Sequence, residues 1–492
     1  MRPFLRYSSH MAISIVPSLS SVGDINARVR QIFDRQHATA QRLRSSTANE
    51  RIAKITKLRD AVIAHAELWY EAAEADFRKP RGEVDLTEIL PVVVEANDAI
   101  RNLKAWMKPT KVWPTMLMAG TSAYIKYEPR GRCLIISPWN YPVNLTFGPV
   151  VSALAGGNTV IIKPSEMTPH LAAAMAKVVA EVFTDDEVAI CEGDASMSTA
   201  LLELPFDHIF FTGSPAIGKV VMTAAAKHLT SVTLELGGKS PTIVDETADL
   251  GLAAQNIMWG KYTNNGQTCI APDHIFVHES VKDAFVAQCK AVLEKAYGAG
   301  AATKDSPHLA RIVNTRHTGR VKALLDDAKS RGARVLVGGE VSESESYIAP
   351  TLLDNISPDA KINSEEIFGP LLPIYGFTKL DEVIDRINAD PKPLALYVFS
   401  RNEDNIQRVM TETSSGGACI NHSVVQYLHG RLPFGGVNNS GIGNAHGHFG
   451  FRTFSHERAV VRTRLNLAAK LFAPGEVPGG LRKILKSLLK WV

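Results

Sequence analysis

Apolar residues recur along this chain with two different spacings. From residue 25 to residue 106 they return every three to four positions, as in Ile52, Ile55 and Leu58, which places them on one face of a helix. This part of the chain is therefore predicted to form several helices. A loop is expected over residues 78–82, where Pro80 and Gly82 interrupt the pattern.

After residue 132 the pattern changes to short apolar runs separated by helical stretches. Strands are predicted at Cys133–Ser137, Thr159–Lys163, Val188–Cys191, His208–Phe211 and Ser231–Leu236. Helices are predicted between them, for example at Leu171–Val182 and Ala216–Lys227. Strands joined by helices form parallel sheets with right-handed crossovers. Such sheets bind ligands beyond the carboxyl ends of their strands, so the polar residues that end these runs are the candidate site.

A second α/β region is expected from residue 237 to residue 421. Helices are predicted there at Leu250–Trp259, Glu279–Ala296 and Arg316–Ser330. Strands are predicted at Ile275–Val277 and Leu394–Phe399. Residues 111–128 are predicted to form a hairpin that leaves the main body and contacts a second subunit. A chain of 492 residues is too long for a single core and favours two large domains.

Composition excludes several classes of protein. Hydrophobic residues make up 45% of the chain, charged residues 21%, and the net charge is +4, which is too small to indicate nucleic-acid binding. The five cysteines have no CxxC or Cys/His spacing, so neither a disulfide framework nor a metal site is predicted. We therefore expect a reducing, cytoplasmic location. No apolar stretch approaches the roughly 20 residues that span a bilayer.

The two ends of the chain differ from its body. Residues 1–24 are predicted to be a disordered lead, with Met1 and Met11 as alternative starts. Residues 465–492 are expected to be a tail that contains an amphipathic basic helix from Gly480 onward. That helix could pack on the body or a partner subunit, contact a membrane surface, or act as a lid near the active site.

Cys269 is a candidate nucleophile. It lies in the stretch Asn264–Asp273, whose Asn, Gly, Pro and Asp residues favour turns and loops. A thiol on a shaped loop is accessible to a substrate. The alternative is a small buried hydrophobic residue, which is the usual state of an intracellular cysteine.

Polar residues at two strand ends complete a catalytic group. Asn140 lies in a loop bracketed by prolines, where its amide could stabilise an oxyanion or simply satisfy a turn. Glu235 ends a strand before Gly237 and Gly238. Burial there would raise its pKa and suit a general base, whereas pairing with Lys239 would make it structural.

Two further stretches could hold a nucleotide, and a third has adjacent carboxylates, an aromatic residue and a Gly-Pro turn. Lys163 and Glu166 could bind ribose hydroxyls, or Ser165 could cap a helix with Glu166 in its first turn. The turn from Gly213 to Gly218 could bring the backbone close to a pyrophosphate at a helix N-terminus. Residues 365–370, Glu-Glu-Ile-Phe-Gly-Pro, fit a surface loop equally well.

The order of these motifs resembles the aldehyde dehydrogenase superfamily, and within it the class 3 branch of fatty and coniferyl-type aldehyde dehydrogenases. The matching stretches are Thr223–Thr230, Thr233–Pro241, Gly266–Asp273 and Pro433–Val437. The resemblance extends from residue 49 to residue 461. It implies an α/β fold with two Rossmann-like, doubly wound parallel-sheet domains and a small β-hairpin oligomerisation element.

The resemblance also implies a division of the chain and a homodimer. Residues 25–110 and 129–236 would bind NAD(P), and residues 237–424 would form the catalytic domain. Residues 111–128 and 425–464 would form oligomerisation and bridging segments. Pro215 stands where the family usually has Thr, which is a departure in the pyrophosphate turn.

Roles follow for individual residues. Cys269 would attack an aldehyde, Asn140 would hold the oxyanion, and Glu235 would activate the water that releases a carboxylic acid. The cofactor would be NAD, with NADP as an alternative, and its implied ligands are Lys163, Glu166, Gly213, Ser214, Gly218, Glu366 and Phe368. The implied substrate pocket is Tyr141, Trp259, Thr268, Phe434 and His446.

Aromatic pocket walls favour an apolar aldehyde, either aromatic or of medium to long chain. Three alternatives stay open. A CoA-acylating dehydrogenase does not need the Glu235 base. A thiol hydrolase would use Cys269 and Glu235 but would leave the ribose-binding pattern without a use, and a non-catalytic protein could share the fold.

Overall fold

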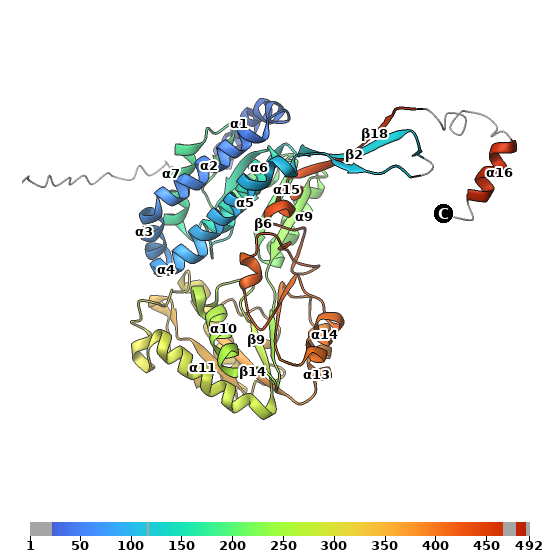
Figure 1. The fold of residues 1–492 in the computed structure, drawn as a ribbon. Helices are drawn as coiled ribbons and strands as arrows, with labels where there is room; N and C mark the ends of the chain where they lie inside the picture. Colours follow the sequence, from blue (N-terminus) through green and yellow to red (C-terminus); the bar gives the residue numbers. More distant parts are fainter. Residues whose placement is uncertain (1–21, 116–117, 466–478, 489–492) are drawn as a thin grey trace, which may run out of the picture.

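Two sheets, one above the other in Figure 1, form the body of the computed structural model, which describes residues 22–115, 118–465 and 479–488. The upper sheet has the strand order β17-β7-β6-β3-β4-β5, and all neighbours are parallel except β17. Its strands are β3 (Arg132–Ile136), β4 (Thr159–Lys163), β5 (Val188–Ile190), β6 (His208–Gly213), β7 (Ser231–Leu236) and β17 (Gly441–Ile442). The five strands predicted from apolar runs are thus all present.

The upper sheet is buried on both faces because side chains alternate across it. Cys133 and Ile135 belong to one hydrophobic cluster, and Leu134 and Ile136 belong to another. The crossover helices are α6 (Asn144–Gly156), α7 (Pro169–Val182), α8 (Ala195–Leu202) and α9 (Pro215–Ala226).

The predicted N-terminal helices cover this sheet. They are α1 (Val22–Leu43), α2 (Ala48–Ala64), α3 (Ala66–Phe77), α4 (Arg81–Val84) and α5 (Leu90–Trp106), with a π-helical turn η1 (Asp85–Ile89) before α5. The predicted loop after α3 is shorter than expected, because α4 begins at Arg81. Thr47 and Glu50 form a reciprocal capping box that fixes the start of α2.

The lower sheet has the order β10-β13-β14-β9-β8-β15-β16, and only β10 is antiparallel. Its strands are β8 (Pro241–Val244), β9 (His274–His278), β10 (Arg334–Val337), β13 (Thr351–Asp354), β14 (Leu371–Phe377), β15 (Ala395–Phe399) and β16 (Gly417–Ile420). Its helices are α10 (Leu250–Tyr262), α11 (Lys282–Tyr297), α12 (Thr315–Ser330), α13 (Leu380–Ala389) and α14 (Glu403–Glu412). The sequence predicted only β9 and β15 among these strands.

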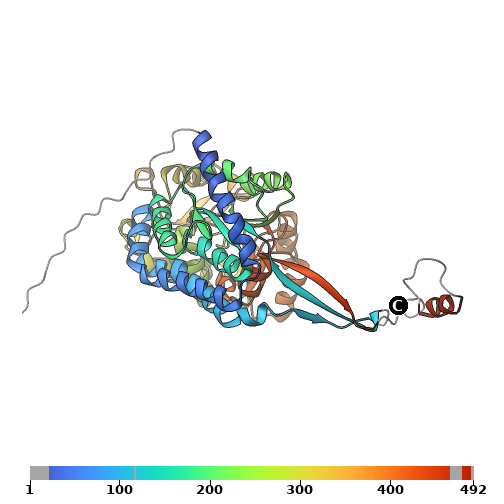
Figure 2. The ribbon, with the colours of Figure 1, turned by 90° about the horizontal axis from the view of Figure 1, so that it is seen from above.

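A three-stranded antiparallel ribbon leaves the body (Figures 1 and 2). The predicted hairpin is present as β1 (Thr110–Val112) and β2 (Thr121–Pro129). The main partner of β2, however, is β18 (Ser455–Thr463), which pairs along its whole length. Local pattern did not reveal this pairing, because its two strands lie more than three hundred positions apart in the chain.

The ends of the described chain are helical. Helix α1 starts at Val22, so residues 22–24 are not part of a disordered lead, and residues 1–21 lie outside the described residues. The predicted tail helix is present as α16 (Gly479–Leu488), beyond the outer end of the ribbon in Figures 1 and 2. In this chain α16 is therefore placed neither on the body nor as a lid over Cys269. Among the described helices, none combines the length and the apolar character that a bilayer-crossing segment needs.

Candidate active site

A turn with three consecutive left-handed residues precedes Cys269. Asn264 and Asn265 both have φ 53°, and Gly266 has φ 76°. Asparagine tolerates this conformation better than other residues with a β-carbon. At Gly266 a β-carbon would lie 2.3 Å from the carbonyl oxygen of Gly369, so only glycine fits. The Asn-Asn-Gly order of the sequence is thus required by the backbone.

Gln267 fixes this turn to the neighbouring segment around Arg311 and Val313. Its Nε2 donates to the carbonyl oxygens of Asn264 and Arg311, each at 3.0 Å. Its Oε1 accepts from the backbone N–H of Val313 at 2.9 Å. These bonds leave little freedom to the loop that carries the half-buried thiol of Cys269.

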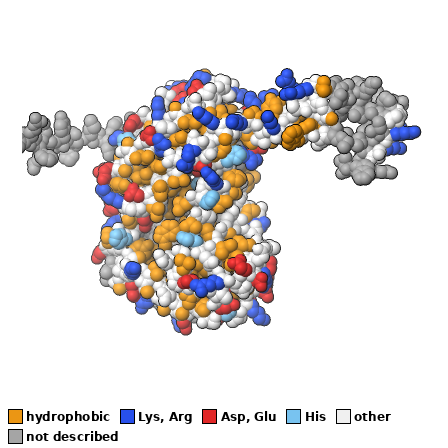
Figure 3. Space-filling view, viewed as in Figure 1, with side chains coloured by type: hydrophobic (Ala, Val, Ile, Leu, Met, Phe, Trp, Pro, Cys, Tyr) orange, Lys and Arg blue, Asp and Glu red, His pale blue; other side chains and the backbone are white. Residues whose placement is uncertain are grey.

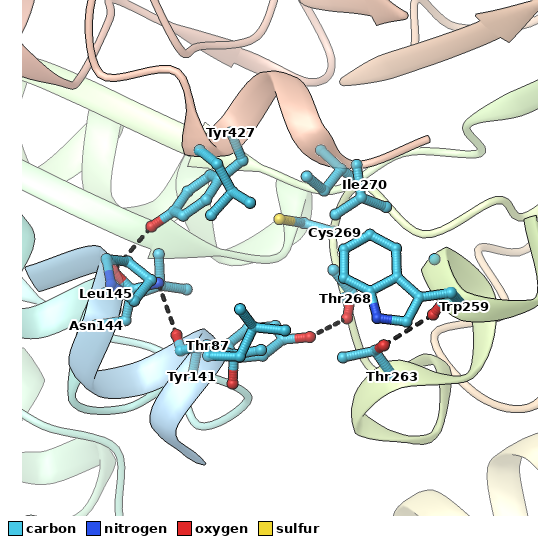
Figure 4. A pocket seen from close by; sticks show the side chains of 15 residues that line it. Thr87, Tyr141, Asn144, Leu145, Trp259, Thr263, Thr268, Cys269, Ile270 and Tyr427 are labelled. Carbon is cyan, nitrogen blue, oxygen red and sulfur yellow. Dashed lines mark hydrogen bonds between the residues drawn. The ribbon is translucent and has the colours of Figure 1, made fainter. Parts of the chain in front are cut away.

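Cys269 lies where two cavities meet. The outer cavity, seen in Figure 4, is lined by Cys269 together with Leu86, Thr87, Pro91, Tyr141, Asn144, Leu145, Trp259, Gly260, Thr263, Thr268, Ile270, Val424, Tyr427 and Leu428. The inner cavity shares Cys269 and is also lined by Glu95, Glu235, Phe434 and His446. Of the predicted pocket residues, Tyr141, Trp259 and Thr268 therefore face the outer cavity, and Phe434 and His446 face the inner one. Tyr427, which lines both, was not predicted.

Asn140 contacts the cysteine loop directly. Its Nδ2 donates to the carbonyl oxygen of Gln267 at 2.9 Å, and the side chain is 3% exposed. Because an amide nitrogen carries two hydrogens, one remains for another acceptor. The neighbouring hydroxyl of Tyr141 lies 2.5 Å from Oγ1 of Thr268. The loop after β3 is thus bonded to the loop that carries the thiol.

A buried ion pair beneath this loop was missed by sequence analysis. Nζ of Lys79 lies 2.7 Å from Oε1 of Glu88 and 3.3 Å from the carbonyl oxygen of Asn140. Oε2 of Glu88 accepts the backbone N–H groups of Val143 and Asn144, both at 3.1 Å. These bonds fix the Asn140 loop to the N-terminus of α6. No periodicity or spacing links residue 79 to residue 140, so the sequence carried no signal for this pair.

Glu235 is buried, and no described residue is its partner. It is 5% exposed, and neither carboxylate oxygen has a hydrogen bond within the described part of the chain. Burial raises its pKa well above the ordinary value. The alternative of a pair with Lys239 is wrong, because Nζ of Lys239 lies 2.5 Å from Asp273. A buried carboxyl that faces a cavity and bonds to nothing is free to take a proton.

Glu366 is partly buried, whereas its neighbour Glu365 is exposed. The stretch is therefore not a simple surface loop. Its Oε1 accepts the backbone N–H of Gly238 at 2.9 Å. A β-carbon at Gly237 would lie 2.4 Å from its carboxylate, which explains one glycine of the Gly-Gly pair. Burial raises the pKa of Glu366 to about 7. Phe368 follows with φ 44°, and its ring packs edge-on against Trp139 at 5.3 Å.

The thiol of Cys269 is surrounded by these acids. Burial, followed by the negative charges of Glu366 and Glu235, raises its pKa to about 12. The sulfur is therefore protonated at neutral pH in the chain alone. A nucleophilic role requires a base or an added positive charge nearby.

Lys163 and Gly213 end β4 and β6 at the carboxyl edge of the upper sheet, and Glu166 and Ser214 follow them, whereas Glu366 and Phe368 lie between β13 and β14 of the lower sheet. Nζ of Lys163 is 2.6 Å from the carboxylate of Glu166, whose side chain is 43% exposed. Ser165 is not a helix cap, because α7 begins at Pro169 after Thr168. The sequence alternative that placed Glu166 in a first helical turn is therefore wrong.

The end of β6 leads directly into α9. Ser214 is the N-cap of α9, and its hydroxyl accepts the backbone N–H of Ile217 at 3.4 Å. Pro215 is the first helical residue, a position that suits its fixed φ. At Gly218 a β-carbon would lie 2.8 Å from a methyl of Leu236, so this glycine allows close packing of helix and strand.

Comparison with known proteins gives the family. The model of the aldehyde dehydrogenase family matches residues 21–460. The chain belongs to the aldehyde dehydrogenase family. This confirms the sequence resemblance and supports an enzyme rather than a non-catalytic protein on the same fold.

Individual aldehyde dehydrogenases place the chain near the class 3 branch. It is 48% identical to AldX of Bacillus subtilis (strain 168), which is provisionally named an aldehyde dehydrogenase. The match covers 88% of this chain and 97% of AldX. It is 41% identical to aldehyde dehydrogenase family 3 member B1 of Homo sapiens, over 96% of this chain and 98% of the relative. The same identity links it to "Aldehyde dehydrogenase, dimeric NADP-preferring" of Rattus norvegicus, over 91% and 96% of the two chains.

The aldehyde dehydrogenase fold is found in solved structures as well. The structure titled "Substrate bound state of Staphylococcus Aureus AldH" matches with a TM-score of 0.89 and 40% sequence identity. The match covers 94% of this chain and 99% of the other. The predicted fold class of two parallel-sheet units is thereby confirmed.

Proposed function

We propose that this aldehyde dehydrogenase oxidises an apolar aldehyde to the carboxylic acid with NAD(P), through a covalent adduct on Cys269. One observation carries the proposal. The Cys269 thiol borders a cavity that it shares with Glu235, a buried carboxyl without a partner, while the amide of Asn140 bonds to the cysteine loop. A nucleophile, a base and an oxyanion donor are therefore in one place.

The Cys269 thiol first loses its proton to water, which the positive charge of a bound oxidised NAD(P) would favour. The sulfur then adds to the aldehyde carbon. The carbon–sulfur bond forms as the carbonyl π electrons move onto oxygen. The free N–H of the Asn140 amide, together with the backbone N–H of Cys269, would hold this oxygen. Such a fixed donor typically accounts for a rate factor of about 10²–10³.

The adduct then loses hydride and becomes a thioester on Cys269. Oxidised NAD(P), when bound, would supply the acceptor for this hydride and a positive charge in the site. Glu235 next removes a proton from a water whose oxygen attacks the thioester carbon. The carbon–sulfur bond breaks, the acid leaves, and the electron pair returns to the Cys269 thiolate.

The residues at the sheet edge suit a dinucleotide. Lys163 and Glu166 present donors and acceptors for ribose hydroxyls, and the side chains of Ile217 and Val220 are exposed apolar groups on the first turns of α9. An apolar surface beside polar groups suits a flat base and its sugar. The half-exposed carboxylate of Glu166 favours NAD, because it would repel a 2′-phosphate. Glu166→Gln is therefore expected to increase the relative use of NADP, and the NADP-preferring rat relative supports keeping that cofactor as an alternative.

The outer cavity supports an apolar substrate, either aromatic or of medium to long chain. Its walls include Leu86, Trp259 and Leu428, and charged side chains are absent from its described lining. Figure 3 shows hydrophobic side chains gathered across the middle of this face of the molecule. The partnerless Glu235 favours water over CoA as the acyl acceptor, because transfer to CoA does not need this base.

A homodimer is part of the proposal. The ribbon carries exposed apolar side chains, namely Val112 (46%), Trp113 (92%) and Val461 (55%). Exposed apolar groups on a protruding ribbon suit contact with a second copy, and the rat relative is named as dimeric. Light scattering should give twice the chain mass, and a monomer at micromolar concentration would contradict this.

The decisive experiment measures reduced cofactor and product together. The purified chain is given aromatic and straight-chain aldehydes with NAD or NADP, with and without CoA. We expect reduced cofactor and free acid in equal amounts, and Cys269→Ala should abolish both. Cys289→Ala is the matched control, because Cys289 is a buried thiol of α11 that lines neither cavity. Full activity in Cys269→Ala, or acyl-CoA as the product, would overturn the proposal.

A further inference from the structure

The two cavities beside Cys269 share part of their lining. Three side chains, Leu145, Cys269 and Tyr427, line both of them. The ring of Tyr427 is the largest of the three. Its position therefore decides how far the space beside the reactive sulfur extends.

A hydrogen bond holds Tyr427 in place. Its hydroxyl donates to Oδ1 of Asn144 at 2.9 Å. Asn144 is itself fixed, since its Nδ2 donates to the carbonyl oxygen of Thr87 at 3.0 Å and its backbone N–H donates to Glu88 at 3.1 Å. Burial raises the pKa of Tyr427, so the phenol stays a neutral donor. Figure 4 shows this bond beside the Cys269 sulfur.

The ring is also braced from the inner cavity. Phe434 and His446 meet it edge-on, with centroids at 5.0 and 4.7 Å. Tyr427 belongs to the short helix η8 (Val425–Leu428), which follows Val424 with φ 68°. A left-handed conformation is costly for a β-branched residue, and such strain is often found in segments that move at functional sites.

The two cavities differ in access. The outer one opens at Leu86 and Leu428, which are 37% and 42% exposed. The inner one lies between α6 and the upper sheet, where Gly148 leaves space and Phe454 forms a wall. With the Tyr427 ring in place, a substituent on the aldehyde has only the outer cavity. With the ring displaced, the same substituent could extend into the inner cavity.

We propose that Tyr427 is a specificity-determining gate, whose hydroxyl bond to Asn144 keeps the inner cavity closed to bulky aldehydes. The proposal rests on the proposed oxidation at Cys269. Small aldehydes react in the outer cavity alone. Bulky ones must first break the Tyr427–Asn144 bond and move the ring.

Two substitutions distinguish the effect of the Tyr427 hydroxyl bond from the effect of the Tyr427 ring. Tyr427→Phe removes the hydroxyl and keeps the ring, whereas Tyr427→Ala removes both. The measured quantity is the ratio of kcat/KM for biphenyl carbaldehyde to that for benzaldehyde. We expect this ratio to rise about fivefold in Tyr427→Phe, as for the loss of one neutral hydrogen bond. In Tyr427→Ala it should rise by on the order of tenfold or more.

The control is Tyr375→Phe. It also removes a part-buried hydroxyl bond, to Asn363 at 2.5 Å, and Tyr375 lines neither cavity. Its ratio should equal that of the unchanged chain. Thermal unfolding of each variant confirms that it is folded. An unchanged ratio in both folded Tyr427 variants would overturn the gate.

A second measurement does not depend on aldehyde oxidation. The rates at which iodoacetamide and pyrene maleimide label Cys269 are followed by peptide mass spectrometry, with Cys269→Ala as background. The gate predicts that Tyr427→Ala increases labelling by the bulky reagent relative to the small one, because the bulky reagent needs the space that the ring occupies. If this occurs in a chain that oxidises no aldehyde, the gate stands and the proposed function is wrong. If aldehydes are oxidised but neither ratio changes, only the gate is wrong.

Discussion

Glu88 and Glu235 are two buried glutamates near Cys269 with opposite surroundings. Glu88 is 0% exposed and accepts hydrogen bonds from Lys79, Val143 and Asn144. Glu235 is 5% exposed and has no bond to any described residue. Burial raises the pKa of both carboxyls. The two carboxyls are thus similarly buried, but Glu88 has hydrogen-bond partners for both oxygens and Glu235 has none among the described residues.

The difference separates structure from chemistry. A buried carboxylate with all its partners holds backbone in place, and its loss leaves other charges exposed to a low dielectric. A buried carboxyl without partners destabilises the fold but keeps a raised pKa and free lone pairs. Glu366 lies between the two, with one bond from Gly238 and a pKa of about 7. Four predictions test this comparison.

Glu235→Gln should have the largest effect on activity. The amide keeps the shape but cannot take a proton from water, so turnover should fall by on the order of 10²–10⁴. Acyl-enzyme on Cys269 should accumulate and be visible by intact mass. Glu365→Gln, at an exposed acid in the same site region, is the control and should keep full turnover. Normal acid release by Glu235→Gln would remove the distinction between the two glutamates.

Glu88→Gln should have the largest effect on stability. Removing one member of a buried ion pair leaves Lys79 uncompensated, and the free energy of unfolding should fall by about 3–5 kcal/mol. Urea unfolding measures this. The double variant Lys79→Met/Glu88→Leu should regain most of the stability but not kcat, because the Asn140 loop still lacks its bonds. A single variant as stable as the unchanged chain would contradict the structural role.

Glu235 should also change how stability depends on pH, and this effect should be smaller than the first two. The folded pKa of Glu235 lies above the ordinary value of 4.5, so between these values the folded chain binds more protons than the unfolded one. Its stability therefore falls as pH rises through this window. Glu235→Gln removes that loss. Its stability relative to the unchanged chain should increase as the pH rises above 4.5 toward the folded pKa of Glu235, and a constant difference in urea unfolding would be evidence against it.

Glu366→Gln should have the smallest effect. Above pH 7 its carboxylate is charged and is the larger of the two acidic contributions that raise the pKa of Cys269. Removing this charge should lower the pKa of the thiol and speed alkylation by iodoacetamide a few-fold at alkaline pH. The measurement is the alkylation rate against pH. An unchanged profile would show that the charge of Glu366 does not control the pKa of the thiol.

Local sequence pattern predicted much of the upper sheet. Each of its five parallel strands is a continuous apolar run between helical stretches, so both the type and the place of each element were visible. The lower sheet was less visible, because β8, β10, β13 and β16 are only four residues long and give no clear period. The long β2–β18 pairing was missed because it joins distant segments.

The sequence by itself determined the family, the elements that carry Cys269, Glu235 and Asn140, and the glycines that close packing demands. These follow from short motifs and from periodicity, which are local properties. The folded structure was needed to show that Glu235 has no partner among the described residues, that Lys79 and Glu88 fix the Asn140 loop, and that Tyr427 lines two cavities. Hydrogen-bond partners and cavity walls come from segments far apart in the chain, so their arrangement exists only after folding has brought those segments together.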